Sequence, residues 1–192
     1  MFGGPPRGGP LFTAMENQTL KVVVTGPFGS GKTTFVATAS DGHAIGSENA
    51  VSDATQALKQ STTTAMDHAT ITLDDGGESV SLYGTPGQER FSFMWPVLSQ
   101  GMHGYLILID ASRLQARAQA RSIVRAFSSF APHVPFVVAV NRWHDREVEA
   151  PELAEFIGVP ATSIIECDPR DRGDCQRALQ CLLSLVRGGE SA

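Results

Sequence analysis

Short apolar runs alternate with amphipathic stretches along the chain between residues 20 and 187. The continuous apolar runs predict buried strands, at 20–25, 104–110, 135–141 and 163–166. Two further runs, 68–73 and 79–83, flank a turn of two aspartates and two glycines and predict an antiparallel hairpin. Helical periodicity predicts helices at 32–39, 90–99, 114–130, 151–157 and 174–187. This order predicts a three-layer α/β fold. Its six-stranded sheet is mostly parallel with one antiparallel hairpin, and the ligand lies at the carboxyl ends of the strands.

The ends of the chain differ in composition from its middle. Residues 1–18 begin with a segment of mostly Gly and Pro and predict a disordered arm. Residues 19–188 predict one domain, since a chain of 192 residues can bury one full core. Residues 189–192 predict a flexible tail.

Composition narrows the class of partner. The net charge of −5 argues against nucleic acid as the main ligand, because phosphate backbones require a basic surface. No apolar run has the length of a membrane span, and the C-terminal residues carry neither a prenylation box nor a polybasic cluster. Three cysteines without metal-ligand spacing fit a reduced compartment. We expect a cytoplasmic protein without a direct membrane anchor, which contacts a membrane only through partners.

The stretch GPFGSGKT, residues 26–33, matches the G-x-x-x-x-G-K-[ST] pattern of a phosphate-binding loop and lies between a predicted strand and a predicted helix. Backbone N–H groups of such a loop face phosphate oxygens, and the helix N-terminus adds positive potential. The Lys would reach the β- and γ-phosphates, and the Thr hydroxyl would bind Mg²⁺. The predicted nucleotide-binding residues of this segment are Gly26, Phe28, Gly29, Ser30, Gly31, Lys32, Thr33 and Thr34.

A second motif, GTPGQERF at residues 84–91, follows the second hairpin strand. It resembles the switch II sequence of Ras-like small GTPases, which are P-loop NTPases. With the phosphate loop and the spacing between them, the resemblance covers the chain from Leu20 to Arg187. The sequences of these motifs are most similar to those of prokaryotic members of the family. These members are the gliding-motility type and, above all, the GTPases encoded in actinobacterial conservon gene clusters. The stretch TTTAMD, residues 62–67, looks like their switch I.

This resemblance implies a GTP-binding regulatory switch that hydrolyses GTP slowly to GDP and phosphate, with Mg²⁺ as cofactor. A switch I Thr would bind Mg²⁺ and the γ-phosphate, which places Thr63 beside Thr33 as a metal ligand, with Thr62 and Thr64 as neighbouring alternatives. The Gly87 amide would contact the γ-phosphate, and Gln88 would orient the attacking water. The implied catalytic residues are therefore Gln88, Lys32 and Thr63.

Two departures from the pattern bear on chemistry. The aspartate that usually opens the switch II motif and holds Mg²⁺ through water is Gly84, so Mg²⁺ should be bound more weakly or depend more on Thr33, Thr63 and the phosphates. Phe28 stands where a small glycine is typical, and its ring could obstruct an arginine finger from a partner. We therefore expect slow intrinsic hydrolysis, accelerated by a partner that repositions Gln88 or an internal Arg.

The base-reading loop departs further. A guanine-reading loop has the pattern N-K-x-D, and the corresponding strand ends in NRWHD, with Asn141 and Arg142 in place. His144 stands in the register of the aspartate, and Asp145 follows it. Either the loop is bulged so that Asp145 reads guanine, which we favour, or guanine selectivity is poor. A last base-binding loop is loosely matched by Asp168, Pro169 and Arg170.

Arginines recur every fourth residue at 113, 117, 121 and 125 and form a basic stripe, which is either a solvated helix face or a contact for an acidic partner or lipid headgroup. The aromatic run FSFMWP at 91–96 either packs the switch helix onto the sheet or is partly exposed for a partner.

Two functional classes remain open. In the first, GTP orders the switches and a protein partner reads the difference. The resemblance implies a roadblock-type regulator, with a sensor kinase complex nearby. In the second, the chain is a non-cycling nucleotide-binding scaffold or an NTPase with relaxed base selectivity, which Gly84, Phe28 and His144 support. A small-molecule kinase has less support, because no Arg-rich lid stands out.

Overall fold

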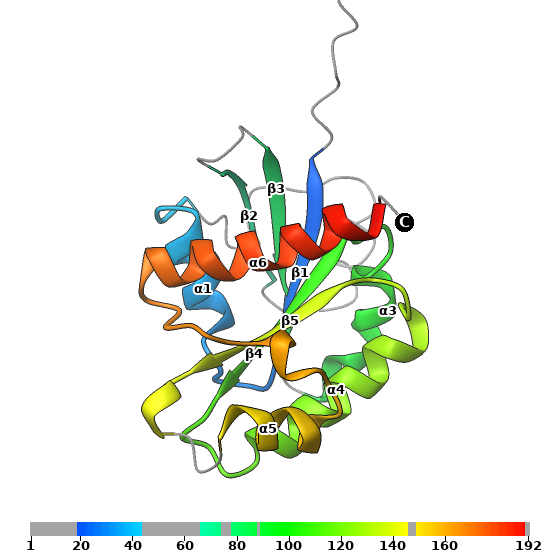
Figure 1. The fold of residues 1–192 in the computed structure, drawn as a ribbon. Coiled ribbons are helices and arrows are strands. Elements are labelled where there is room, and N and C mark those ends of the chain that lie inside the picture. Colours follow the sequence, from blue (N-terminus) through cyan, green and yellow to red (C-terminus); the bar gives the residue numbers. More distant parts are fainter. Residues whose placement is uncertain (1–18, 44–65, 74–77, 88, 146–148, 191–192) are drawn as a thin grey trace, which may run out of the picture.

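The computed structural model of the chain describes residues 19–43, 66–73, 78–87, 89–145 and 149–190. Figure 1 shows a six-stranded sheet with helices on both of its faces. The strand order is β2-β3-β1-β4-β5-β6. The strands are β1 (Leu20–Thr25), β2 (Asp67–Thr72), β3 (Ser79–Gly84), β4 (Gly104–Asp110), β5 (Phe136–Asn141) and β6 (Ile164–Glu166).

The predicted sheet architecture is confirmed. β2 and β3 pair antiparallel, with Asp67 opposite Gly84, and every other neighbouring pair is parallel. All seven residues of β4 are buried, as its continuous apolar sequence predicts for a central strand covered on both faces. The carboxyl ends of β1, β3, β4 and β5 therefore meet at one edge of the sheet, which is where a ligand binds in folds of this class.

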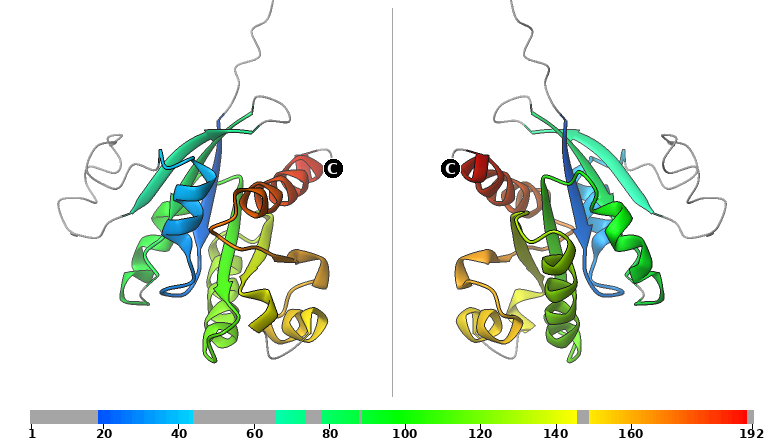
Figure 2. Two further views of the ribbon diagram at one scale, coloured as in Figure 1. Left: turned by 90° about the vertical axis from the view of Figure 1, so that its left-hand side faces the viewer. Right: turned by 90° about the vertical axis from the view of Figure 1, so that its right-hand side faces the viewer.

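The helices are α1 (Lys32–Ala39), α3 (Trp95–Leu98), α4 (Ala116–Phe130), α5 (Ala150–Ile157) and α6 (Arg172–Glu190), and the side views in Figure 2 show them on both sides of the sheet. Alternate residues of the strands point into two separate cores. Val22 and Val24 of β1 pack in one core with Phe35 of α1 and with three leucines of α6, Leu179, Leu182 and Leu183. Val23 packs with the other core, which includes Phe127 of α4 and Leu153 of α5.

One predicted helix is wrong. Residues 90–99 do not form a continuous helix, because a 3₁₀ helix (Glu89–Met94) leads into the four-residue α3. Pro96 lies in the first turn of α3, where its missing N–H is tolerated; inside a longer helix it would remove a hydrogen bond. Of the aromatic run, Trp95 is buried and Phe93 is 61% exposed, so both expectations for this segment apply to part of it.

The remaining helix predictions differ from the structure only at their ends. Helix α6 begins at Arg172, and the Asp171 carboxylate accepts a hydrogen bond from the Asp174 backbone N–H, 2.8 Å away, as an N-terminal cap. In the described part of the chain, none of the helices combines the length and the apolar composition that crossing a membrane requires. The predicted arm, residues 62–65 of the predicted switch I with Thr63 among them, and Gln88 lie outside the described residues.

The aromatic core between α4 and the sheet provides a stability test. The Phe127 ring is fully buried, and its centroid lies 4.9 Å from those of Tyr105 and Phe130 and 5.6 Å from that of Trp95. We expect Phe127→Ala to lower the free energy of unfolding by about 3 to 5 kcal/mol in urea titrations, because the cavity is lined on three sides by rings that cannot collapse into it. Leu114→Ala, at a side chain that is 75% exposed, should change it by less than about 0.5 kcal/mol. Equal effects of the two substitutions would contradict this assignment of the core.

Candidate functional site

The loop between β1 and α1, residues 26–31, has the conformation that its glycines predict. Gly26, Gly29 and Gly31 have φ values of 146°, 74° and 108°. At Gly26 a side chain is also excluded by space, because a Cβ atom would lie 2.0 Å from the carbonyl oxygen of Leu108 in β4. The chain therefore turns tightly against the central strand, and α1 begins directly at Lys32.

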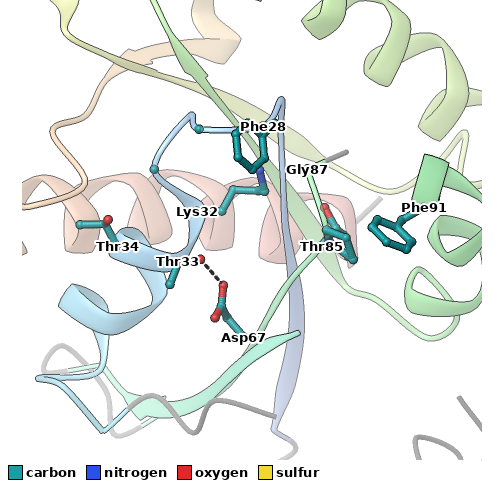
Figure 3. A pocket seen from close by; sticks show the side chains of 11 residues that line it. Phe28, Lys32, Thr33, Thr34, Asp67, Thr85, Gly87 and Phe91 are labelled. Carbon is teal, nitrogen blue, oxygen red and sulfur yellow. Dashed lines mark hydrogen bonds between the residues drawn. The ribbon is translucent and has the colours of Figure 1, made fainter. Parts of the chain in front are cut away.

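A cavity of about 430 Å³ opens over this loop. Its walls come from the loop, the first residue of β2 and the segment after β3, and Figure 3 shows Phe28, Lys32, Thr33, Asp67, Gly87 and Phe91 around it. The exposed ring of Phe28 lies at the loop, next to the Lys32 side chain. The structure thus brings together the predicted residues of the phosphate loop and Gly87.

The Lys32 side chain is buried and folds back onto its own loop. Its Nζ donates hydrogen bonds to the carbonyl oxygens of Gly26, at 2.9 Å, and Pro27, at 2.7 Å. Burial lowers the pKa of Lys32 to about 8, and the negative charge of Asp67 only partly opposes this shift. An anion bound in the cavity would favour the charged form of Lys32, so a bound phosphate and the Lys32 ammonium would stabilise each other.

Asp67 is a site residue that the sequence analysis missed. Its Oδ2 accepts a hydrogen bond of 2.6 Å from the Thr33 hydroxyl, as Figure 3 shows. Asp67 faces Gly84 across the antiparallel pair, and a Cβ atom at Gly84 would lie 3.1 Å from Cβ and 3.2 Å from Oδ2 of Asp67. A carboxylate on β2 therefore lies where the absent side chain of residue 84 would point. Asp67 and Gly84 flank the two predicted hairpin strands, 68–73 and 79–83, and extending their pairing by one residue would have placed the two residues opposite each other.

The segment after β3 closes onto the phosphate loop. The Thr85 hydroxyl donates to the Thr25 hydroxyl at 3.0 Å, and the Thr85 N–H donates to the Val24 carbonyl at 2.9 Å. A Cβ atom at Gly87 would lie 2.5 Å from Lys32 Nζ and 2.8 Å from Phe28 Cα, so the Gly87 backbone lies against the loop. The Gly87 position agrees with a backbone contact to a terminal phosphate, which stays a prediction.

The predicted base-reading residues border the same loop. The Asn141 side-chain amide donates to the Ser30 carbonyl at 3.3 Å and is buried. Arg142 has φ of 53°, and its guanidinium donates to the Ser112 hydroxyl at 2.9 Å. His144 and Asp145 follow in a short 3₁₀ helix and are exposed, with His144 Nε2 at 3.8 Å from Glu166 Oε1. That the loop is bulged so that Asp145 reads guanine, with poor guanine selectivity as the alternative, stays a prediction.

The second predicted base loop lies next to the first. Pro169 packs on the phosphate loop, since a Cβ atom at Gly31 would lie 2.8 Å from its Cγ. The Asp168 carboxylate is occupied by Arg170, whose Nη2 lies 2.7 Å and whose Nε lies 2.9 Å from its oxygens. The Arg170 hydrogen bonds lower the pKa of Asp168. Asp168 therefore orders its own loop through Arg170.

Comparison with known protein families decides the family. A family described as conserved hypothetical ATP-binding proteins matches residues 42–166, more than half of the chain. The chain belongs to this family. The matched segment begins after the phosphate loop and extends through β6, so family membership and the geometry of the loop are separate indications of a nucleotide-binding protein. An uncharacterized protein of Methanocaldococcus jannaschii is 27% identical over 142 residues, which cover 74% of this chain and 82% of that protein.

The assignment to Ras-like small GTPases of the gliding-motility or conservon type is wrong, because the matching family is the ATP-binding one. The two motifs behind that assignment lie around a phosphate site. Any protein that binds a nucleoside triphosphate in this fold faces the same demands on glycines, lysine and hydroxyls there, so such motifs indicate a site more reliably than a family. The roadblock-type regulator and the sensor kinase complex rested on that resemblance alone and stay untested predictions.

The shifted pKa of Lys32 predicts how nucleotide binding depends on pH. Phosphate binding requires charged Lys32, which the free protein loses as the pH rises through about 8. We expect the affinity for a nucleoside triphosphate to be level below this pH and to fall above it, with a limiting slope of about tenfold per pH unit. Calorimetric titrations between neutral and alkaline pH would measure this. A Lys32→Arg variant, whose side chain keeps its charge, should lack the alkaline fall. A wild-type affinity independent of pH would contradict the role of Lys32.

Proposed function

We propose that this protein is a nucleoside triphosphatase with relaxed base selectivity, which binds ATP or GTP with Mg²⁺ and slowly releases the γ-phosphate to water. The observation that carries the proposal is the phosphate loop, with Lys32 buried in it and the Thr33–Asp67 pair at its end. The family membership supports nucleotide binding independently of the loop. The hydrolysis of the bound triphosphate and its slow rate are proposed in addition to nucleotide binding.

The residues around Thr33 fit a magnesium ion. A hydroxyl and a carboxylate are hard oxygen donors, which Mg²⁺ prefers, and their oxygens already lie 2.6 Å apart. Among the described residues no three of the His, Cys, Asp and Glu type gather into a protein-only metal site, which agrees with an ion that takes its other ligands from phosphates and water. Thr33 would bind the ion directly, and Asp67 would orient that hydroxyl or a bound water. The ion would neutralise charge on the β- and γ-phosphates.

Relaxed base selectivity is supported by the loops at the base end of the site. Strict guanine recognition needs an available carboxylate to pair with two donors of the base. The Asp168 carboxylate is held by Arg170, His144 occupies the register position for such a group, and Asp145 lies one residue beyond it in an exposed 3₁₀ turn. Asn141 and Pro169 lie against the phosphate loop. Most of the binding free energy would then come from the phosphates.

The proposed chemistry uses Gln88 to orient the attacking water and Thr63 to bind Mg²⁺ and the γ-phosphate. Both residues lie outside the described part of the chain. Their roles were implied by the likeness of residues 62–67 and 84–91 to the switch sequences of small GTPases, and both roles stay predictions. A nucleotide-binding scaffold that does not turn over is the outcome if these residues do not act in this way.

The base and the reaction are tested together. We expect fluorescent ATP and GTP analogues to bind within about tenfold of each other in the presence of Mg²⁺, since neither base is strictly read. We also expect phosphate release from both, lost in Gln88→Leu with binding retained. Guanine selectivity of several orders of magnitude would contradict relaxed recognition, and tight binding without phosphate release would establish the scaffold.

The Asp67 assignment is tested by exchanging two residues across the strand pair. Asp67→Gly should weaken Mg²⁺-dependent triphosphate binding by roughly 10- to 100-fold, because the Thr33 hydroxyl loses its acceptor. Restoring a carboxylate from the other strand, in Asp67→Gly with Gly84→Asp, should recover much of this loss. Gly84→Asp alone should not improve on wild type, since its side chain would crowd Asp67. Equal Mg²⁺ dependence in wild type and Asp67→Gly would exclude Asp67 from the metal site.

A further inference from the structure

An arginine from outside the predicted motifs contacts the phosphate loop. Arg113 lies between β4 and α4, and its Nη1 donates a hydrogen bond of 3.1 Å to the Phe28 carbonyl. The guanidinium also lies against Gly29, where a Cβ atom would be 2.6 Å from Nη2 and 2.9 Å from Cζ. A strong cation thus lies beside a loop whose expected ligand is a polyphosphate.

The backbone of Arg113 is fixed by a hydrogen bond, whereas its guanidinium makes only weak contacts. The Arg113 backbone N–H donates to the Asp110 carbonyl at 3.1 Å, which fixes the start of the side chain. Its Nε lies 3.4 Å from Asp110 Oδ2, a carboxylate that is buried while the Arg113 side chain is 50% exposed. Asp110 Oδ1 is occupied by Ser112, through the backbone N–H at 3.1 Å and the hydroxyl at 2.7 Å. The neutral Phe28 carbonyl is a contact that a phosphate can replace, and the buried Asp110 carboxylate keeps Arg142 Nη1, 3.5 Å from its Oδ2, if Arg113 turns away.

We propose that Arg113 is an internal arginine finger, which leaves the Phe28 carbonyl and donates hydrogen bonds to the γ-phosphoryl group in the transition state of hydrolysis. This inference rests on the proposed triphosphatase function. In that reaction a water oxygen bonds to the γ-phosphorus. The bond from phosphorus to the bridging oxygen breaks, its electron pair leaves with the nucleoside diphosphate, and the water proton passes to the released phosphate or to solvent. Negative charge grows on the bridging and γ-oxygens, where a planar guanidinium is a strong donor.

Phe28 explains why such an arginine would be internal. Its side chain is 63% exposed at the loop, on the side of the cavity, and would stand in the path of an arginine from another protein. Arg113 already lies on the carbonyl of this residue, which lines the cavity, and its side chain would have to turn about its bonds to enter the cavity. Arg121, another arginine of the stripe, lies in a different place. Its Cζ is 5.5 Å from the centroid of the Phe156 ring, which belongs to α5.

The test compares Arg113→Ala with Arg121→Ala, a matched loss of one arginine from the same stripe, under single turnover with saturating Mg²⁺ and triphosphate. We expect Arg113→Ala to slow phosphate release by about 100-fold and Arg121→Ala to leave it unchanged. Arg113→Lys should rescue little, because an ammonium lacks the planar fork. Binding of a fluorescent diphosphate should be equal in all variants, whereas its trapping by aluminium fluoride, which mimics the transferring phosphoryl group, should be lost only without Arg113.

Three results would overturn the inference. If Arg113→Ala turns over like wild type, Arg113 is not a finger, and the proposed hydrolysis stands. If Arg113→Ala weakens diphosphate binding as much as it slows turnover, the arginine only clamps the loop. A wild-type protein that releases no phosphate and is not trapped by aluminium fluoride would instead refute the proposed hydrolysis, and the role of Arg113 with it.

Discussion

The close approach of the phosphate loop to the central strand is the constraint on which the site depends. Gly26 turns the chain so close to the Leu108 carbonyl that no side chain fits between them. This turn lets α1 start at Lys32 and directs the lysine back over the loop. Because β4 is buried along its whole length, the wall behind the loop is rigid. The cavity therefore exists before any ligand binds, which lowers the cost of ordering it.

Several loops from distant parts of the sequence are fixed against this one turn. Asn141 at the end of β5, Pro169 after β6 and Gly87 after β3 each contact it. Asp110 links two of these regions, since the buried carboxylate lies 3.4 Å from Arg113 Nε and 3.5 Å from Arg142 Nη1. One arginine contacts the phosphate loop and the other follows Asn141. The arginine on the phosphate loop and the arginine of the base loop thus share one anionic partner.

The sheet was predictable because its strands are continuous apolar runs with clear ends, and the hairpin because a double Asp-Gly turn separates two alternating runs. The helix at 90–99 was not, because the effect of Pro96 depends on where a helix starts. The phosphate loop followed from its glycine spacing. The roles of Asp67 and Arg113 could not be predicted in this way. Asp67 contacts Thr33 from 34 residues away and Arg113 contacts Phe28 from 85 residues away. Such contacts arise only from strand register and strand order. The family prediction was wrong because the two motifs behind it reflect phosphate chemistry that several families share.

The most direct test of a nucleotide site centred on this loop is amide hydrogen exchange of the full chain, with and without Mg²⁺ and a slowly hydrolysed ATP analogue. The account predicts protection of the amides of residues 26–34, where N–H groups would face phosphate oxygens, with smaller protection near Asn141 and Asp168. The protection at 26–34 should disappear in Lys32→Ala. Unchanged exchange in the loop, or protection confined to other parts of the chain, would contradict the central claim that residues 26–33 bind the triphosphate.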